Sequence, residues 1–127
     1  MSPRILHVED NAANRMIVRD LLEFQGYQVV EVLDGEQALA ATERERPDLI
    51  LMDIQLPSIS GLEATRRIKA REHLRRIPIV AVTSFALSGD DTKASEAGCD
   101  AYIAKPYRPR DLLQIIQKLL QSGSATG

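Results

Sequence analysis

Two short apolar stretches of the sequence predict buried strands. The first reads ILHVED over Ile5–Asp10, and the second reads LILMD over Leu49–Asp53. Each is a short, mainly apolar run that ends in carboxylates. Such runs are typical of strands that are buried on both faces of a parallel sheet. Carboxylates directly after them lie at the carboxyl edge of the sheet, where ligands bind in open α/β folds.

Three further apolar runs extend this pattern along the chain: Val29–Val32, Ile79–Val82 and the weaker Ala101–Ala104. Between the runs lie segments with the three-to-four-residue apolar spacing of amphipathic helices. We expect these helices over Asn11–Gln25, Glu36–Arg46, Gly61–Arg71, Gly89–Ala97 and Pro109–Leu120. Strands that alternate with helices predict an α/β three-layer sandwich, in which helices cover both faces of a five-stranded parallel sheet.

One face of the first helix carries Met16, Ile17, Leu21 and Phe24, and we expect it to pack on the sheet. The composition after Leu120 becomes rich in serine and glycine. We therefore expect one domain over residues 1–121 and a flexible tail over residues 122–127.

Length, charge and composition exclude several classes of protein. The chain has 127 residues, which suits a single domain, and its formal charge of −2 gives no basic field for direct nucleic-acid binding. The apolar run near the N-terminus is too short for a signal peptide or a membrane span, so we expect a cytoplasmic protein without a membrane partner. The single cysteine, Cys99, excludes an internal disulfide and is expected to be a buried structural thiol.

Polar residues end several of the predicted strands. Glu9 and Asp10 follow the first, Asp53 ends the third, Thr83 ends the fourth and Lys105 follows the fifth. Carboxylates in one crevice repel each other by up to about 4 kcal/mol per pair at roughly 4 Å, which a divalent cation relieves. All-oxygen ligands favour Mg²⁺. A lysine and a hydroxyl beside them suit the oxygens of a phosphoryl group, so the set predicts phosphoryl transfer to an aspartate.

Four motifs in this order resemble those of the response-regulator receiver domain of bacterial two-component signalling. They are Val8-Glu9-Asp10-Asn11, Met52-Asp53-Ile54 with Pro57 and Gly61, Val82-Thr83-Ser84, and Lys105-Pro106. The resemblance covers Ile5 to Leu120 and extends to free-standing single-domain regulators and to receivers of hybrid histidine kinases. It implies the flavodoxin-like, CheY-like fold with strand order 2-1-3-4-5.

The resemblance also implies a role for each site residue. Asp53 would accept the phosphoryl group from a phosphohistidine, Thr83 and Lys105 would hold its oxygens, and Thr83 with Tyr102 would form the switch pair. Asp10, Asp53 and the backbone carbonyl of Gln55 would bind Mg²⁺, with Glu9 holding a coordinated water. The chain would then be a switch of protein contacts without an output domain, and not an enzyme beyond slow self-dephosphorylation.

The implied partners are a histidine kinase or a histidine phosphotransfer protein and a downstream protein target. The phosphodonor would dock over Asn14, Ile17, Val18, Phe85 and Tyr107, on a monomer or a weak dimer. In the family, the residues at the positions of Gln55 and Phe85 tune the lifetime of the acyl phosphate. The bulky ring of Phe85 therefore predicts slow autodephosphorylation.

Two other functions fit parts of the pattern. A Mg²⁺-dependent phosphohydrolase with an aspartyl-phosphate intermediate needs a second carboxylate two residues after the nucleophile, where this chain has Gln55. A flavodoxin-type carrier needs a phosphate-binding loop after the first strand, where Glu9 and Asp10 would repel a phosphate. Glu9-Asp10-Asn11 alone also fits an ordinary helix N-terminus. The common location of all four motifs at one edge of the sheet favours the phosphoacceptor.

Overall fold

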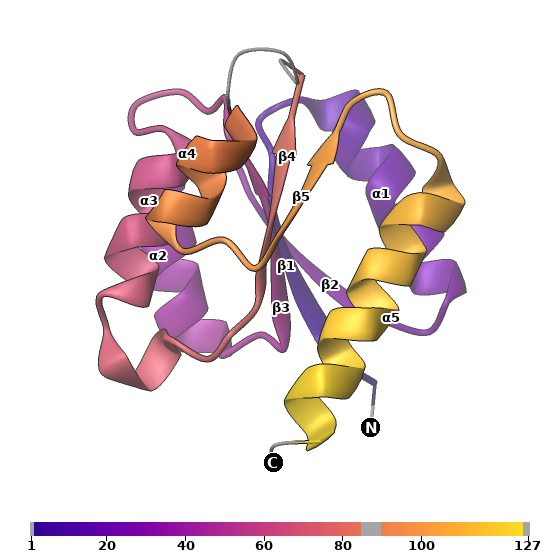
Figure 1. Ribbon diagram of the computed structural model, residues 1–127. Helices are drawn as coiled ribbons and strands as arrows, with labels where there is room; N and C mark the ends of the chain where they lie inside the picture. The colour runs from indigo at the N-terminus through magenta and orange to yellow at the C-terminus, as the bar shows by residue number, and fades with distance from the viewer. Residues whose placement is uncertain (1, 85–89, 126–127) are drawn as a thin grey trace.

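The computed structural model describes residues 2–84 and 90–125, in which strands and helices alternate along the chain (Figure 1). The strands are β1 (Arg4–Val8), β2 (Gln28–Val32), β3 (Leu49–Asp53), β4 (Ile79–Thr83) and β5 (Ala101–Ala104). The helices are α1 (Ala12–Phe24), α2 (Gly35–Glu45), α3 (Gly61–Lys69), α4 (Asp90–Ala97) and α5 (Pro109–Ala125), with a short 3₁₀ turn, η1, at Glu72–Leu74.

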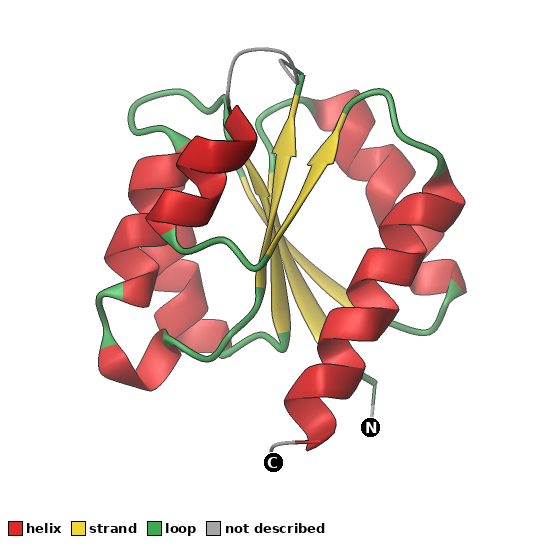
Figure 2. Cartoon of the chain, viewed as in Figure 1, coloured by secondary structure: helices red, strands yellow, loops and turns green. Residues whose placement is uncertain are grey.

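The five strands form one parallel sheet in the order β2-β1-β3-β4-β5. Helices α1 and α5 cover one face, and α2, α3 and α4 cover the other (Figure 2). The predicted three-layer sandwich and its strand order are therefore confirmed. The register aligns Val8 with both Val32 and Met52, and Asp53 with Val82, so the carboxyl ends of the central strands lie at one edge.

The core consists of apolar clusters on both sides of the sheet, because successive strand residues point to opposite faces. Leu6 of β1 packs in the cluster that includes α2 and α3, whereas Ile5 packs in the cluster that includes α1 and α5. All five residues of β3 and of β4 are buried, as the continuous apolar runs predicted. The central strands thus form a rigid base for the residues that follow them.

Helix α1 packs on the sheet through a different face from the one predicted. Val18 and Leu22 are buried in the core, and the predicted Leu21 is half-buried against the same cluster, whereas Met16, Ile17 and Phe24 are exposed. The prediction was wrong for these three residues because apolar residues cover more of the circumference of this helix than the sheet can bury. Periodicity alone does not choose between the two parts of such a wide apolar surface.

Helices α3 and α5 end further from their predicted last residues than the other helices do. Helix α3 ends at Lys69, and η1 then buries Leu74 where a longer helix was expected. Helix α5 continues to Ala125, past the domain boundary expected at residue 121. Once a helix is formed, each added residue closes another backbone hydrogen bond, so the helix extends through serine and alanine even though Gly123 costs about 1 kcal/mol relative to alanine. The predicted start of α4 at Gly89 lies outside the described residues.

None of the helices in residues 2–84 and 90–125 is both long enough and apolar enough to cross a membrane.

Candidate functional site

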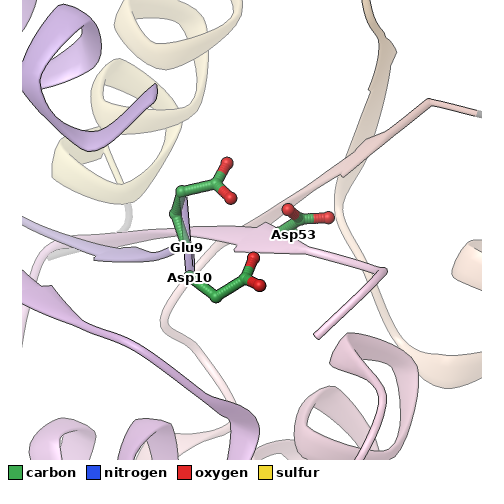
Figure 3. A group of neighbouring side chains, drawn as sticks. All are labelled: Glu9, Asp10 and Asp53. Carbon is green, nitrogen blue, oxygen red and sulfur yellow. The ribbon is translucent and has the colours of Figure 1, made fainter. Parts of the chain in front are cut away.

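Neighbouring strands bring three carboxylates together at the carboxyl edge of the sheet. Glu9 and Asp10 directly follow β1, and Asp53 is the last residue of β3, which pairs with β1. Each of the three residues offers one oxygen, and these oxygens all lie within 4.8 Å of one another (Figure 3). Glu9 and Asp53 are buried and Asp10 is exposed. The sequence prediction that these side chains share one site is confirmed.

The turn from β1 into α1 fixes Glu9. Asn11 is the N-cap of α1, and its side-chain oxygen accepts a hydrogen bond from the Asn14 amide at 2.9 Å. The Glu9 carboxylate accepts one from the Asn11 amide at 3.2 Å, and the Arg15 guanidinium donates to the Glu9 carbonyl at 3.0 Å. The capping residue that begins α1 therefore also holds one carboxylate of the acidic site.

The loop after β3 fixes Asp53. One oxygen of its carboxylate accepts a hydrogen bond from the Gln55 amide at 2.9 Å. The Ile54 amide donates to the Val82 carbonyl, and the Gly61 amide donates to the Ile54 carbonyl, both at 2.9 Å. The chain thus returns against the end of β3 before α3 begins. This return packs the start of α3 against the backbone of Asp53.

Lys105 brings the only side-chain cation within 4.0 Å of these carboxylates in the described part of the chain. Its Nζ lies 3.1 Å from a Glu9 oxygen and 3.6 Å from an Asp53 oxygen. The Lys105 amide donates to the Thr83 carbonyl at 2.6 Å, and the Lys105–Pro106 peptide bond is cis. Because the lysine contacts two carboxylates at once, it offsets part of their mutual repulsion.

Burial and mutual charge shift the pKa values at the site. Burial raises the pKa of Asp53 to about 6, and the nearby Glu9 carboxylate adds to this rise. The hydrogen bond from the Gln55 amide and the charge of Lys105 oppose it. Burial also acts to raise the pKa of Glu9, but hydrogen bonds from the Asn11 amide and from neighbouring side chains outweigh it and lower that pKa. The carboxylates raise the pKa of Lys105 in spite of its burial.

The donor set fits Mg²⁺. Three carboxylates meet one ammonium group, so negative charge is in excess, and every available ligand atom is oxygen. The exposed Asp10 leaves one side of the cluster open to water, as suits an ion that keeps several waters. Glu9, Asp10 and Asp53 are the residues that would hold the ion, and it would supply the positive charge that the cluster lacks.

The removal of one carboxylate should stabilise the metal-free chain and weaken the stabilising effect of Mg²⁺. In metal-free buffer at neutral pH, Asp53→Asn is expected to raise the free energy of unfolding by about 2 kcal/mol, because it relieves repulsion in the cluster. Mg²⁺ should then stabilise the wild-type chain much more than the variant, since a ligand stabilises only the state that it binds. Urea unfolding with and without Mg²⁺ measures both effects. An equal gain from Mg²⁺ in the two chains would contradict the expectation.

The two residues of the predicted switch pair lie on adjacent strands. Thr83 is the buried last residue of β4. Tyr102 of β5 is half-buried, aligned with Ala81, and packs against the apolar cluster of α3 and α4. Phe85, which the sequence placed beside the site, lies outside the described residues.

The residues predicted for donor docking have different exposures. Ile17 is 65% exposed, and Asn14 and Tyr107 are half-buried. Val18 is only 5% exposed and belongs to the core, so it is not a surface contact as expected. The cause is the orientation of α1 described above, in which Val18 faces the sheet.

A pocket behind Lys105 was not predicted from the sequence. It has a volume of about 360 Å³ and lies between α1 and the segment that joins β5 to α5. His7 lines it and is buried, and burial lowers the pKa of this histidine to about 4. The only sequence signal was a histidine within an otherwise apolar strand.

Comparisons with known proteins agree with this geometry. The family model described as response regulator receiver domain matches residues 5–117. The polar-differentiation response regulator DivK of Brucella anthropi is 44% identical over 120 residues, which cover 94% of this chain and 98% of the relative.

Solved structures give the same result. The receiver domain of a sensor histidine kinase from Pseudomonas aeruginosa PAO1, with a magnesium ion coordinated in its active-site cleft, is 43% identical and has a TM-score of 0.89, with 95% of this chain and 99% of that chain covered. A CheY-like receiver domain protein from Methanospirillum hungatei is 35% identical with a TM-score of 0.91, and each chain is fully covered.

Proposed function

This chain belongs to the response regulator receiver family, and from that premise we propose that Asp53 accepts a phosphoryl group from a phosphohistidine and that the modified chain changes its protein contacts. The observation that carries the proposal is the position of Asp53. Its carboxylate lies beside Glu9 and Asp10, within 4.8 Å, and beside the Lys105 ammonium group at 3.6 Å. Transfer to Asp53 would therefore place the new negative charge next to the groups that can neutralise it.

The proposed step is a displacement at phosphorus. A carboxylate oxygen of Asp53 attacks, the nitrogen–phosphorus bond of the donor breaks, and the donor imidazole takes its electron pair and leaves. Because the pKa of Asp53 is about 6, the carboxylate is mainly ionised at neutral pH and can act as the nucleophile. Mg²⁺, when bound, supplies positive charge beside the phosphoryl oxygens.

Two further residues would respond to the new group. Lys105 would turn from Glu9 toward a phosphoryl oxygen, and the buried Thr83 hydroxyl would hold another one. Movement of Thr83 would pass to Tyr102 on the adjacent strand and change the surface of α4, β5 and α5, where a downstream protein would bind. The ligand role of the Gln55 carbonyl, the cytoplasmic location, the weak dimer and the slow loss of the phosphoryl group stay predictions.

The phosphohydrolase alternative lacks support at the site. Turnover of an aspartyl phosphate needs a second carboxylate as general acid and base, and the residue two positions after Asp53 is an exposed glutamine, Gln55. We therefore propose a phosphoacceptor that signals through protein contacts.

Phosphoryl incorporation tests the proposal. The chain is incubated with acetyl phosphate, with and without Mg²⁺, and its intact mass is recorded. We expect the wild-type chain to gain one phosphoryl group only with Mg²⁺, and Asp53→Asn to gain none. Asp20→Asn is the matched control, because Asp20 is an exposed aspartate on α1, and it should label like the wild type. Labelling of a folded Asp53→Asn, or none in a folded wild-type chain, would overturn the proposal.

Charge on α1 tests where the phosphodonor docks. Ile17→Glu should slow transfer from a phosphorylated histidine phosphotransfer protein at least tenfold while labelling by acetyl phosphate is unchanged, since it puts a charge on an exposed apolar contact. Phe24→Glu is the matched control, because Phe24 is 87% exposed at the far end of the same helix. Transfer rates measured by quenched time courses distinguish the two. Equal effects of the two variants would exclude docking near Ile17.

A further inference from the structure

The end of α3 and the turn after it concentrate positive charge. Residues 63–76 hold six arginine and lysine residues against two glutamates, although the whole chain has a formal charge of −2. The rest of the chain therefore carries a net negative charge. Five of the six basic residues are exposed, and we call them the basic end: Arg66, Arg67, Arg71, Arg75 and Arg76. Because η1 leads into the start of β4, this surface lies at the amino edge of the sheet, opposite the acidic site (Figure 1).

The sixth basic residue, Lys69, fixes the backbone that displays these arginines. Its side chain is only 14% exposed, and its Nζ donates to the carbonyls of Arg75 and Ile77 at 2.9 and 2.8 Å and to an Asp100 oxygen at 3.0 Å. The Arg75 guanidinium donates in return to the Lys69 carbonyl at 3.2 Å. Leu74 is fully buried and anchors the same turn. A turn held in this way loses little conformational entropy when a partner binds to it.

The chain itself accounts for the two arginines in the last turn of α3. Glu63 is shared by Arg66 and Arg67, at 3.5 and 3.1 Å. The last turn of a helix also favours cations, because its free carbonyls carry partial negative charge. Exposed ion pairs of this kind stabilise a fold by less than about 1 kcal/mol each. Their guanidinium groups stay accessible to a partner.

The arginines beyond α3 have less compensation within the chain. Arg71 lies 3.6 Å from Glu43 of α2, a carboxylate that His73 also contacts. Arg75 and Arg76 follow η1, and neither has a carboxylate within 4.0 Å of its cationic atoms in residues 2–84 and 90–125. The helix end and the ion pairs therefore do not account for these two side chains. Their charge is available to a partner.

We propose that the basic end binds a short segment of another protein that is rich in aspartate and glutamate. Guanidinium groups pair with carboxylates through two parallel hydrogen bonds, which a lysine cannot do. An extended polyanion such as DNA or an anionic membrane fits less well, because its field also reaches the negatively charged remainder of the chain. A short acidic segment contacts only the basic end.

The position of the basic end implies that this contact does not depend on signalling. The arginines lie at the amino edge of the sheet, whereas Asp53 is the last residue of β3 at the carboxyl edge. The acidic partner would therefore bind whether or not Asp53 carries a phosphoryl group. Such a contact would hold the chain in an assembly and leave the surfaces around Asp53 free for other proteins.

An acidic peptide tests the proposal. A fluorescein-labelled peptide of eight glutamates is titrated with the full chain at an ionic strength of about 0.1 M, and its fluorescence polarisation is followed. We expect saturable binding, and none of a control peptide of eight glutamines. A DNA duplex and vesicles of phosphatidylglycerol and phosphatidylcholine, at an equal concentration of charge, should bind at least tenfold more weakly. Equal or tighter binding of either polyanion would overturn the choice of partner, and a glutamate peptide that does not bind would overturn the site.

Paired substitutions locate the contact. Arg75→Gln combined with Arg76→Gln should weaken binding of the glutamate peptide at least tenfold, and glutamine keeps a donor for the Lys69 carbonyl. Arg108→Gln combined with Arg110→Gln is the matched control, because it removes two exposed arginines beside the start of α5 and should change the affinity less than twofold.

Urea unfolding verifies that both double variants are folded. Equal weakening by the two would overturn the proposal. Labelling of both by acetyl phosphate should match the wild type, so a failure of this site is distinguishable from a failure of the role of Asp53.

Discussion

Gly61→Ala is expected to lower the free energy of unfolding by at least about 3 kcal/mol, because backbone atoms occupy the place of the new methyl group. A Cβ atom at Gly61 would lie 2.0 Å from the carbonyl oxygen of Asp53 and 2.9 Å from the Cα of Ile54. Neither atom belongs to a side chain that can rotate away. The start of α3 would have to move off the end of β3, and the Gly61 amide would lose its hydrogen bond to Ile54.

Gly26→Ala is the matched control for this prediction. Gly26 has a φ of +90°, but a Cβ there would meet no atom within 4 Å. The control therefore reports backbone strain alone, about 1–2 kcal/mol. Urea unfolding followed by circular dichroism compares the two variants, and labelling by acetyl phosphate reports whether Asp53 has also moved. A loss for Gly61→Ala no larger than that for Gly26→Ala would show that α3 can shift at little cost.

His7→Leu is expected to stabilise the metal-free chain, and the gain should grow as the pH falls. Burial lowers the pKa of His7 from 6.5 to about 4 in the folded chain. Below pH 6.5 the unfolded chain therefore binds a proton that the folded chain resists until about pH 4. This cost in folding free energy is absent above pH 6.5 and complete below about pH 4. It reaches about 3 kcal/mol at the acidic end of the range, and replacement of His7 by leucine removes it.

The measurement is a set of urea unfolding curves for both chains between neutral and acidic pH. The difference in unfolding free energy between the two chains isolates the effect of His7, because Asp53 is present in both. Asp53 itself acts on stability in the opposite direction. With its pKa raised to about 6, Asp53 takes up a proton more readily when folded, which favours the folded state as the pH falls. A gain for His7→Leu that stayed constant over the whole range would contradict the burial of this histidine.

Much of the site followed from the sequence because strand ends are easy to recognise. Apolar runs predicted where β1 and β3 end, and parallel pairing then required Glu9, Asp10 and Asp53 to meet. Lys105 was predicted by the same rule and lies 3.1 Å from Glu9. These predictions needed only element order and the common direction of the strands.

Other features did not follow from local pattern. The orientation of α1 about its own axis depends on competition among several apolar side chains for one area of the sheet. In this orientation Ile17 is exposed and Val18 is buried. The close approach at Gly61 depends on how far the loop after Asp53 returns toward β3. Neither quantity is encoded in the periodicity of a single segment, because each is decided by packing between segments that are distant in the sequence.

The alternating α/β pattern, the acidic site and its oxygen-rich chemistry follow from the amino-acid sequence alone, since apolar periodicity and residue type at strand ends suffice for these. The buried face of α1, the sharing of charge among Glu9, Asp53 and Lys105, and the pocket beside His7 instead depend on tertiary packing. The two groups of features differ in the range of the interactions that set them. Periodicity and chain direction act within and between neighbouring elements, whereas burial, pKa values and cavities arise from all the elements that pack around one point.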